Sequence, residues 1–260
     1  MNNPGFVLTR KGVVVIDPGS SVQIGRFVLD RLKTITRDPV IAVFNTHIHG
    51  DHWLGNHAIH DAYPNAVIYA HPNMIAKAQG EGANWIRSLD QLTEGATRGT
   101  QAVLPNMGLD NADNLRIGNL HFRIYHNGLA HTDNDIMIEV VEEKVMFLAD
   151  NVTALRMPRM DDGSFAGNLA AVDLALASAA THFVPAHGKS GGREVPESYK
   201  GLLTTLTASV KKYQEQGLQD YEMKDKVVAD LAAYKQWALF EHNIGKLVSL
   251  AYLQAESEGF

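Results

Sequence analysis

Three imidazoles and a carboxylate lie within seven residues in the segment 46–52, which reads Thr-His-Ile-His-Gly-Asp-His. Imidazole nitrogen together with carboxylate oxygen favours zinc, with iron as a second choice. Structural zinc sites usually include cysteine ligands, and this chain contains no cysteine. The segment therefore indicates an open, catalytic metal centre.

Residues 40–44, which end two positions before this segment, are all apolar. A short apolar run of this kind is typical of a buried strand. Polar side chains that follow such a strand are held by a rigid scaffold and still face a cleft. We therefore expect the histidines of 46–52 at the mouth of a strand.

The pattern His47-x-His49-x-Asp51-His52 resembles the signature of the metallo-β-lactamase superfamily. Three later segments match the family in type and order. Residues 129–135 are similar to its third-histidine motif, 147–151 to the strand end with the bridging carboxylate, and 183–188 to its last-histidine motif. The resemblance covers roughly residues 5 to 190.

Two features depart from the family pattern. The third-histidine motif usually has glycine where this chain has Ala130 and Asn134. Because asparagine tolerates a left-handed backbone, we expect the turn to survive. The family fold also normally opens with one or two strands before the segment that matches Gly5–Asp17, so we expect an N-terminus that has been shortened.

The resemblance implies a dinuclear site. Its first metal would take His47, His49 and His131, its second Asp51, His52 and His187, and Asp150 would bridge the two. Three nitrogen ligands leave one position of a tetrahedral zinc ion for water. We expect two zinc ions, with iron or manganese as alternatives.

Asp135 is the last residue of the third-histidine segment and has two interpretations. It can accept a hydrogen bond from a ligand histidine, which orients the ring and raises its basicity. Alternatively, it is a solvated carboxylate in a turn.

The predicted activity is hydrolysis by a metal-bound hydroxide, with Asp51 orienting the hydroxide and shuttling its proton. With aspartate at position 150, the site resembles those of glyoxalase II and of lactonases, and the chain overall is similar to hydrolases associated with sulfur oxidation and quinoproteins. We therefore expect a small ester, thioester or lactone as substrate, and less readily a β-lactam. One alternative is an oxidoreductase similar to the mononuclear iron persulfide dioxygenases, and another is a non-enzymatic metal-binding module.

Substrate-binding residues are not identified by any motif. Candidates close to the motif segments are Trp53, Trp85, Asn127, Arg156 and Asn168, with Arg159 in the same loop as Arg156. For Trp53 we favour a place in the core. Histidines outside the motifs are not predicted as ligands.

The bulk composition is that of a globular protein, and the resemblance implies a small molecule as its partner. The chain has 260 residues, 45% of them hydrophobic and 20% charged, and a net charge of −6. The negative charge without a basic run disfavours nucleic acid, and no apolar stretch is long enough to span a bilayer. We expect a soluble protein, cytoplasmic, or periplasmic if a signal segment was removed, with its oligomeric state open.

Periodicity predicts a mixed α/β fold that positions these motifs. Strands are expected at 13–17, 40–45, 66–70, 120–125, 136–141, 144–148 and 182–185, and helices at 20–35, 73–98, 170–180 and beyond 194. The family resemblance implies that these form an αββα sandwich. We expect a metallo-β-lactamase-like domain over 1–194 and a helical C-terminal extension over 195–260, packed on it.

Overall fold

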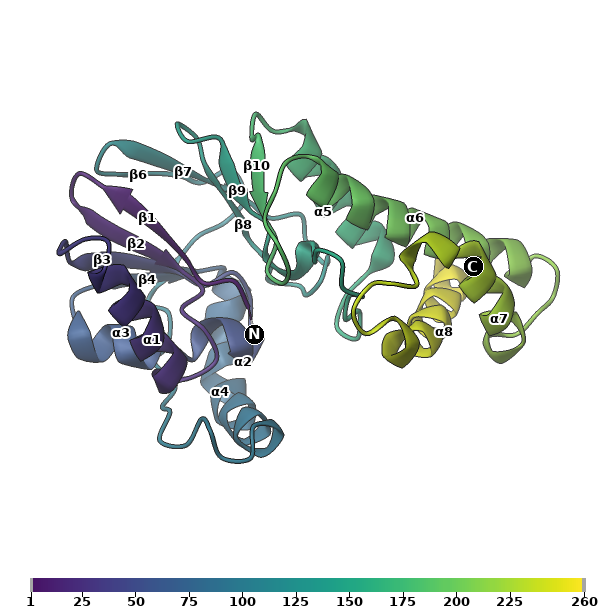
Figure 1. Cartoon of the computed structure of the whole chain (residues 1–260), viewed down its shortest axis with the longest axis horizontal. Coiled ribbons are helices and arrows are strands. Elements are labelled where there is room, and N and C mark those ends of the chain that lie inside the picture. Colours follow the sequence, from purple (N-terminus) through teal and green to yellow (C-terminus); the bar gives the residue numbers. More distant parts are fainter. Residues whose placement is uncertain (1, 259–260) are drawn as a thin grey trace.

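The computed structural model describes residues 2–258 and contains two five-stranded sheets that lie face to face (Figure 1). The first sheet has the order β1-β2-β3-β4-β5, in which β1 is antiparallel to β2 and the later pairs are parallel. Its strands are β1 (Gly5–Thr9), β2 (Gly12–Ile16), β3 (Val40–Phe44), β4 (Val67–Ala70) and β5 (Met107–Gly108).

The second sheet has the order β10-β9-β8-β7-β6, in which β10 is parallel to β9 and the other pairs are antiparallel. Its strands are β6 (Asn114–Ile117), β7 (Leu120–Tyr125), β8 (Met137–Val140), β9 (Val145–Phe147) and β10 (His182–Val184). The strands predicted at 136–141 and 144–148 are therefore confirmed as the antiparallel pair β8 and β9.

The alternation of side chains in β2 shows how the layers form. Val14 and Ile16 face the second sheet and share a buried cluster with Phe122 and Ile138. Val13 and Val15 point the other way, into a cluster with the helix α1 (Val22–Lys33). Both faces of β2 are thus buried, as its uninterrupted apolar run indicates.

Helices cover the outer face of each sheet. The first sheet carries α1, α2 (Gly50–Trp53), α3 (Asn56–Ala62) and α4 (Pro72–Leu92), and the second carries α5 (Phe165–Ala177) and α6 (Glu194–Gln214). The arrangement confirms the predicted αββα sandwich.

Some element boundaries differ from the prediction. Helix α4 continues through Gly80 and Gly82, although glycine disfavours a helix interior, and it ends at Leu92. Helix α5 begins five residues early, at Phe165, because the side chain of Ser164 accepts a hydrogen bond from the Gly167 N–H and caps the helix. Strand β1 was not predicted, since its residues lack a clear alternation.

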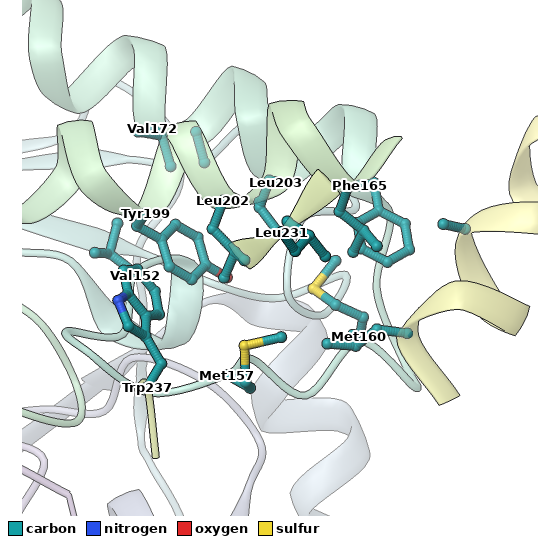
Figure 2. Close-up of a cluster of buried hydrophobic side chains, with 14 of the residues drawn as sticks. Val152, Met157, Met160, Phe165, Val172, Tyr199, Leu202, Leu203, Leu231 and Trp237 are labelled. Carbon is teal, nitrogen blue, oxygen red and sulfur yellow. The ribbon is translucent and has the colours of Figure 1, made fainter. Parts of the chain in front are cut away.

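The C-terminal region is helical, as predicted. Helix α6 runs alongside α5 and beyond the sheet, where α7 (Asp220–Asp230) and α8 (Phe240–Glu258) pack against it (Figure 1). Figure 2 shows the buried cluster that joins this region to the sandwich, with Met157 and Met160 beside Leu203 and Leu231. Within residues 2–258, no helix has both the length and the apolar character needed to cross a bilayer.

Candidate metal centre

The seven predicted ligands meet at one edge of the sandwich, where several strands end. His47 and His49 follow β3, and Asp51 and His52 lie in the first turn of α2. The other three come from the second sheet, with His131 between β7 and β8, Asp150 in the 3-10 turn after β9, and His187 after β10. The structure therefore brings together segments up to 140 residues apart, from His47 to His187.

The first group consists of His47, His49, His131 and Asp150, all of them buried. Nδ1 of His49 lies 3.0 Å from Nε2 of His131. Oδ2 of Asp150 lies 3.3 Å from Nε2 of His131 and 3.9 Å from Nε2 of His47. These donor atoms thus face a common centre.

The second group consists of Asp51, His52 and His187. Oδ2 of Asp51 lies 3.5 Å from Nε2 of His52 and 3.5 Å from Nε2 of His187. Oδ1 of Asp150 lies 3.7 Å from the first of these nitrogens and 3.3 Å from the second. Asp150 therefore turns one carboxylate oxygen toward each group.

The donor atoms have the spacing of metal ligands, and three of them lack a hydrogen-bond partner. Zinc–nitrogen bonds of about 2.0–2.1 Å in a tetrahedral site separate neighbouring donors by roughly 3.3 Å. The distances above, from 3.0 to 3.9 Å, bracket that value. Nε2 of His47, Nε2 of His52 and Oδ1 of Asp150 are buried without a hydrogen-bond partner among the described residues. Orphaned buried polar atoms are rare in folded proteins, and a cation bound between them would supply the missing partner.

Burial prepares the first group for a cation. It lowers the pKa of His131 to about 4 and the pKa of His47 well below its ordinary value, so that both rings keep a free lone pair at neutral pH. Burial also opposes ionisation of Asp150, but the neighbouring His52 and His131 outweigh it and hold its pKa well below the usual range.

His52 behaves differently because carboxylates surround it. Burial lowers its pKa, but the charges of Asp51, Asp17 and Asp150 outweigh that effect and raise the pKa to about 10. Without a metal ion, His52 is therefore protonated at neutral pH.

Asp17 is a functional residue that the sequence analysis missed. Its Oδ2 accepts a hydrogen bond from Nδ1 of His52 at 2.9 Å and another from the Thr46 hydroxyl at 2.7 Å. The Thr46 hydroxyl in turn lies 3.0 Å from Nδ1 of His47. Asp17 thus fixes two of the ligand rings, and the available signal was an aspartate directly after an apolar strand.

Two carboxylates reach the site from residues with unusual backbone angles. Asp17 has a φ of 49°, and Ala149, which precedes Asp150, has a φ of 53°. Non-glycine residues in this region are strained and cluster at functional sites. Both strained residues lie where the chain leaves the end of a strand and turns toward the candidate metal centre.

Asp135 lies in neither of the two environments considered for it. It is 2% exposed, and its carboxylate accepts hydrogen bonds from the Thr132 N–H at 2.6 Å and the Thr132 hydroxyl at 2.8 Å. Burial raises its pKa to about 7. Asp135 therefore closes the turn after His131 and is a buried carboxylate, not a solvated one.

Asn134 also stabilises that turn. It keeps a negative φ, so its replacement of the family's glycine causes no left-handed strain. Its side-chain oxygen accepts a hydrogen bond from the Ile48 N–H at 2.9 Å. Asn134 thereby ties the His131 turn to the segment that carries His47 and His49.

A cavity of about 180 Å³ opens beside His49. Trp85, whose ring lies 5.1 Å from that of His49, and Arg159 line it, and both are among the predicted substrate contacts. Lys77 adds a second positive charge, paired with Asp133 at 2.7 Å. The lining is strongly polar and includes the carboxylates of Glu81, Asp133 and Asp162 beside the two cations.

The other predicted substrate contacts lie elsewhere. Trp53 and Asn168 are fully buried, and Trp53 donates a hydrogen bond to the Ile48 carbonyl, which confirms its place in the core. Asn127 donates to the Gly167 carbonyl, and Arg156 pairs with Ala238. Neither of these two is among the described residues that line the cavity.

Comparison with known proteins gives a family match and several structural neighbours. The model of the metallo-beta-lactamase superfamily matches residues 1–215. No curated protein matches the sequence. A metallo-beta-lactamase from Pontibacter korlensis has a TM-score of 0.64 at 20% identity, over 76% of this chain and 85% of that one.

Two Pseudomonas structures extend the comparison. The metallo-beta-lactamase FIM-1 from Pseudomonas aeruginosa, in its mono-zinc form, has a TM-score of 0.62 at 20% identity, over 78% of this chain and 83% of that one. The sec-alkylsulfatase Pisa1 from Pseudomonas sp. has a TM-score of 0.77 at 17% identity over 97% of this chain, which spans 47% of that longer protein. At these identities the neighbours share the fold, including the C-terminal helices in the case of Pisa1. Together with the family match, the His/Asp clusters at the sheet edge show that the chain belongs to the metallo-beta-lactamase superfamily.

Proposed function

We propose that the protein is a metal-dependent hydrolase of a small ester, thioester or lactone. The observation that carries this proposal is the orientation of the Asp150 carboxylate, whose two oxygens face two separate groups of donors. We assign His47, His49 and His131 to a first zinc ion, Asp51, His52 and His187 to a second, and Asp150 to both. Seven ligands of this type suit two zinc ions.

When bound, two zinc ions lower the pKa of a water molecule to about 7 and polarise a carbonyl oxygen. The residues of the chain supply the remaining functions. Asp51 is the most accessible of the proposed ligands, with its side chain 31% exposed, and its Oδ2 faces His52 and His187. Its carboxylate can orient the attacking water molecule, accept its proton and pass it to the departing oxygen or sulfur of the substrate.

The cavity beside His49 is a candidate place for part of the substrate, since it adjoins one of the proposed ligands. A volume of about 180 Å³ suits a small molecule or one end of a larger one. Trp85 offers an apolar wall, while Arg159 and Lys77 can contact an acyl oxygen or another electron-rich group. The Pisa1 likeness adds alkyl sulfate esters to the substrates worth testing, because that enzyme shares the fold over nearly the whole chain.

Elemental analysis of the purified protein, combined with a hydrolysis panel, tests the proposal. The panel contains a thioester, a lactone, a carboxylic ester, a β-lactam and an alkyl sulfate. We expect about two zinc ions per chain and turnover of the thioester, lactone or ester. One iron per chain with oxygen consumption and no hydrolysis would contradict the proposal and support the persulfide dioxygenase alternative.

A further inference from the structure

His49 uses both of its ring nitrogens. Nδ1 faces the first donor group, 3.0 Å from Nε2 of His131. Nε2 points away from that group and donates a hydrogen bond to Oδ2 of Asp162 at 3.1 Å. A carboxylate on the outer nitrogen fixes the tautomer in which Nδ1 carries the lone pair, and it makes that nitrogen more basic.

Asp162 lies in a less rigid setting than Asp17, the corresponding partner of His52. Asp17 directly follows a buried strand and is itself buried. Asp162 belongs to the connecting segment 152–164, between the 3-10 turn after β9 and helix α5, and its side chain is 50% exposed. Contacts from other elements must therefore hold its carboxylate against His49.

The C-terminal helical region supplies several of these contacts. The side chain of Gln254, in α8, donates to the Gly163 carbonyl at 2.9 Å and accepts from the Phe165 N–H at 2.9 Å. Upstream in the segment, the Ala238 N–H donates to the Leu155 carbonyl at 2.8 Å. Residues from beyond the sandwich thus hold the segment on both sides of Asp162.

A row of alternating charges leads from α8 to the same carboxylate. Lys246, in α8, forms an ion pair with Asp161. Arg159 pairs with Asp161 at 3.1 Å and with Asp162 at 3.2 Å. Asp161 thus lies between two cations and Arg159 between two carboxylates, and this network orients the Asp162 side chain toward His49 despite its exposure.

The connecting segment also packs tightly on the turn that carries His131. The Ser164 N–H donates to the Ala130 carbonyl at 2.8 Å. A Cβ atom at Gly163 would lie 2.4 Å from the Ala130 oxygen, so this approach requires glycine. A displacement of the segment would therefore disturb both His49 and His131.

We propose that Asp162 is a positioning residue for the ligand His49, and that α8 holds it in place through Gln254 and Lys246. This inference rests on the proposed metal site. It assigns a role to the C-terminal helices, which set the affinity of the first donor group for zinc from outside the sandwich.

The first test is the affinity of the full-length protein for Zn²⁺, measured by competition with a chelator. Replacing Asp162 by Asn removes the charge and keeps the shape of the side chain, and we expect a roughly 10- to 100-fold loss of affinity at one site. The matched control is Asp173→Asn, which removes a carboxylate of similar exposure, 56%, that pairs with Lys200 on the outer helices. We expect the control to change the affinity less than about twofold.

A double-mutant cycle distinguishes positioning from general stabilisation. Gln254→Ala should lower the affinity for Zn²⁺ in the unaltered protein and have little further effect in the Asp162→Asn background. A merely structural role of Gln254 would lower the thermal midpoint equally in both backgrounds and leave no such coupling in zinc affinity. The absorption bands of bound Co²⁺, at saturation, should also shift in Asp162→Asn because the basicity of His49 changes.

The outcomes separate this inference from the proposed function. If the unaltered protein binds no Zn²⁺, the metal site itself is wrong, and the role of Asp162 is wrong with it. If the unaltered protein binds Zn²⁺ and Asp162→Asn binds it equally well, with an unchanged Co²⁺ spectrum, the positioning role alone is overturned.

Discussion

At the scale of single residues, the inner and outer sides of the ligand rings have different partners. The inner nitrogens of His47, His49 and His52 face the metal centre, and their outer nitrogens meet an oxygen of Thr46, Asp162 and Asp17, respectively. Such partners fix the ring orientation before any ion binds. The conformational entropy of these side chains is therefore lost on folding and not on metal binding, which favours tight metal binding.

The role of Asp51 can be tested by substitution. Asp51→Ala should lower kcat/KM by roughly 10²- to 10⁴-fold, because it removes the group that orients the water and accepts its proton. Far-UV circular dichroism should remain unchanged, since Asp51 is partly exposed. Asp30→Ala, at a helical carboxylate that is 71% exposed and remote from the site, is the control and should keep full activity. Unchanged turnover in Asp51→Ala would contradict the mechanism.

Metal binding should release a proton from His52. Its pKa of about 10 means that the ring is protonated at pH 7 in the metal-free protein, whereas a ligand must be neutral. His131, with a pKa of about 4, has no proton to lose at that pH. Titration calorimetry at pH 7 in buffers of different ionisation enthalpy should therefore show about one proton released.

The raised pKa of His52 also predicts how the stability of the metal-free protein depends on pH. The unfolded chain loses this proton near pH 6.5 and the folded chain near pH 10. The stabilisation from protonated His52 is thus complete below pH 6.5 and is lost as the pH rises through about 10. Zinc affinity should increase over the same interval, and an affinity independent of pH between 7 and 9 would contradict the assignment.

At the scale of elements, close contacts between loops and helices place the ligand segment. The carbonyl of Gly19 accepts a hydrogen bond from the Gly55 N–H at 2.7 Å, which holds the turn after Asp17 against α2 and α3. Helix α1 continues this contact, since a Cβ atom at Gly25 would lie 2.5 Å from the Gly55 oxygen. The crossing of α1 and α3 therefore depends on a residue without a side chain.

Two glycine substitutions in helices should have opposite effects on stability. Gly25→Ala should lower the free energy of unfolding by about 1–3 kcal/mol, because the added methyl group forces the helices apart. Gly80→Ala, in α4, should raise it by roughly 0.5–1 kcal/mol, because nothing lies within 4 Å and alanine is the better helix former. Urea denaturation of both variants measures the difference, and a stabilised Gly25→Ala would refute the close crossing.

At the scale of the whole molecule, one buried cluster joins the sandwich to the C-terminal helices. It includes Met146 of β9, Val172 of α5, Leu203 of α6 and Val248 of α8. The family match, over residues 1–215, likewise crosses the predicted boundary at 194. The two-domain division remains a prediction, and the continuous cluster favours a single folding unit.

Leu203→Ala tests this cooperativity. The side chain is fully buried, so we expect the free energy of unfolding to fall by about 2–5 kcal/mol. Hydrogen exchange should speed up by the same factor in the sheet strand β3 and in helix α8, because both would open in the same event. Faster exchange confined to α8 would instead show that the C-terminal helices unfold on their own.

The sequence by itself determined the superfamily, the candidate metal-binding residues and the mixed α/β fold class. His47, His49, Asp51 and His52 lie in one short segment, and the apolar runs have the periodicity of alternating strands and helices, to which the family resemblance adds the αββα layers. Short-range patterns of this kind can be read from a chain because the residues that act together are also neighbours in it.

Only the tertiary structure decided which residues support the ligands. Asp17 lies 35 residues from His52, and Asp162 lies 113 residues from His49. Neither pairing has a local signature, because hydrogen bonds between distant segments depend on how the sheets and the C-terminal helices pack. The same reason explains why Trp53 is a core residue while Trp85 lines the cavity, although both follow the ligand segment.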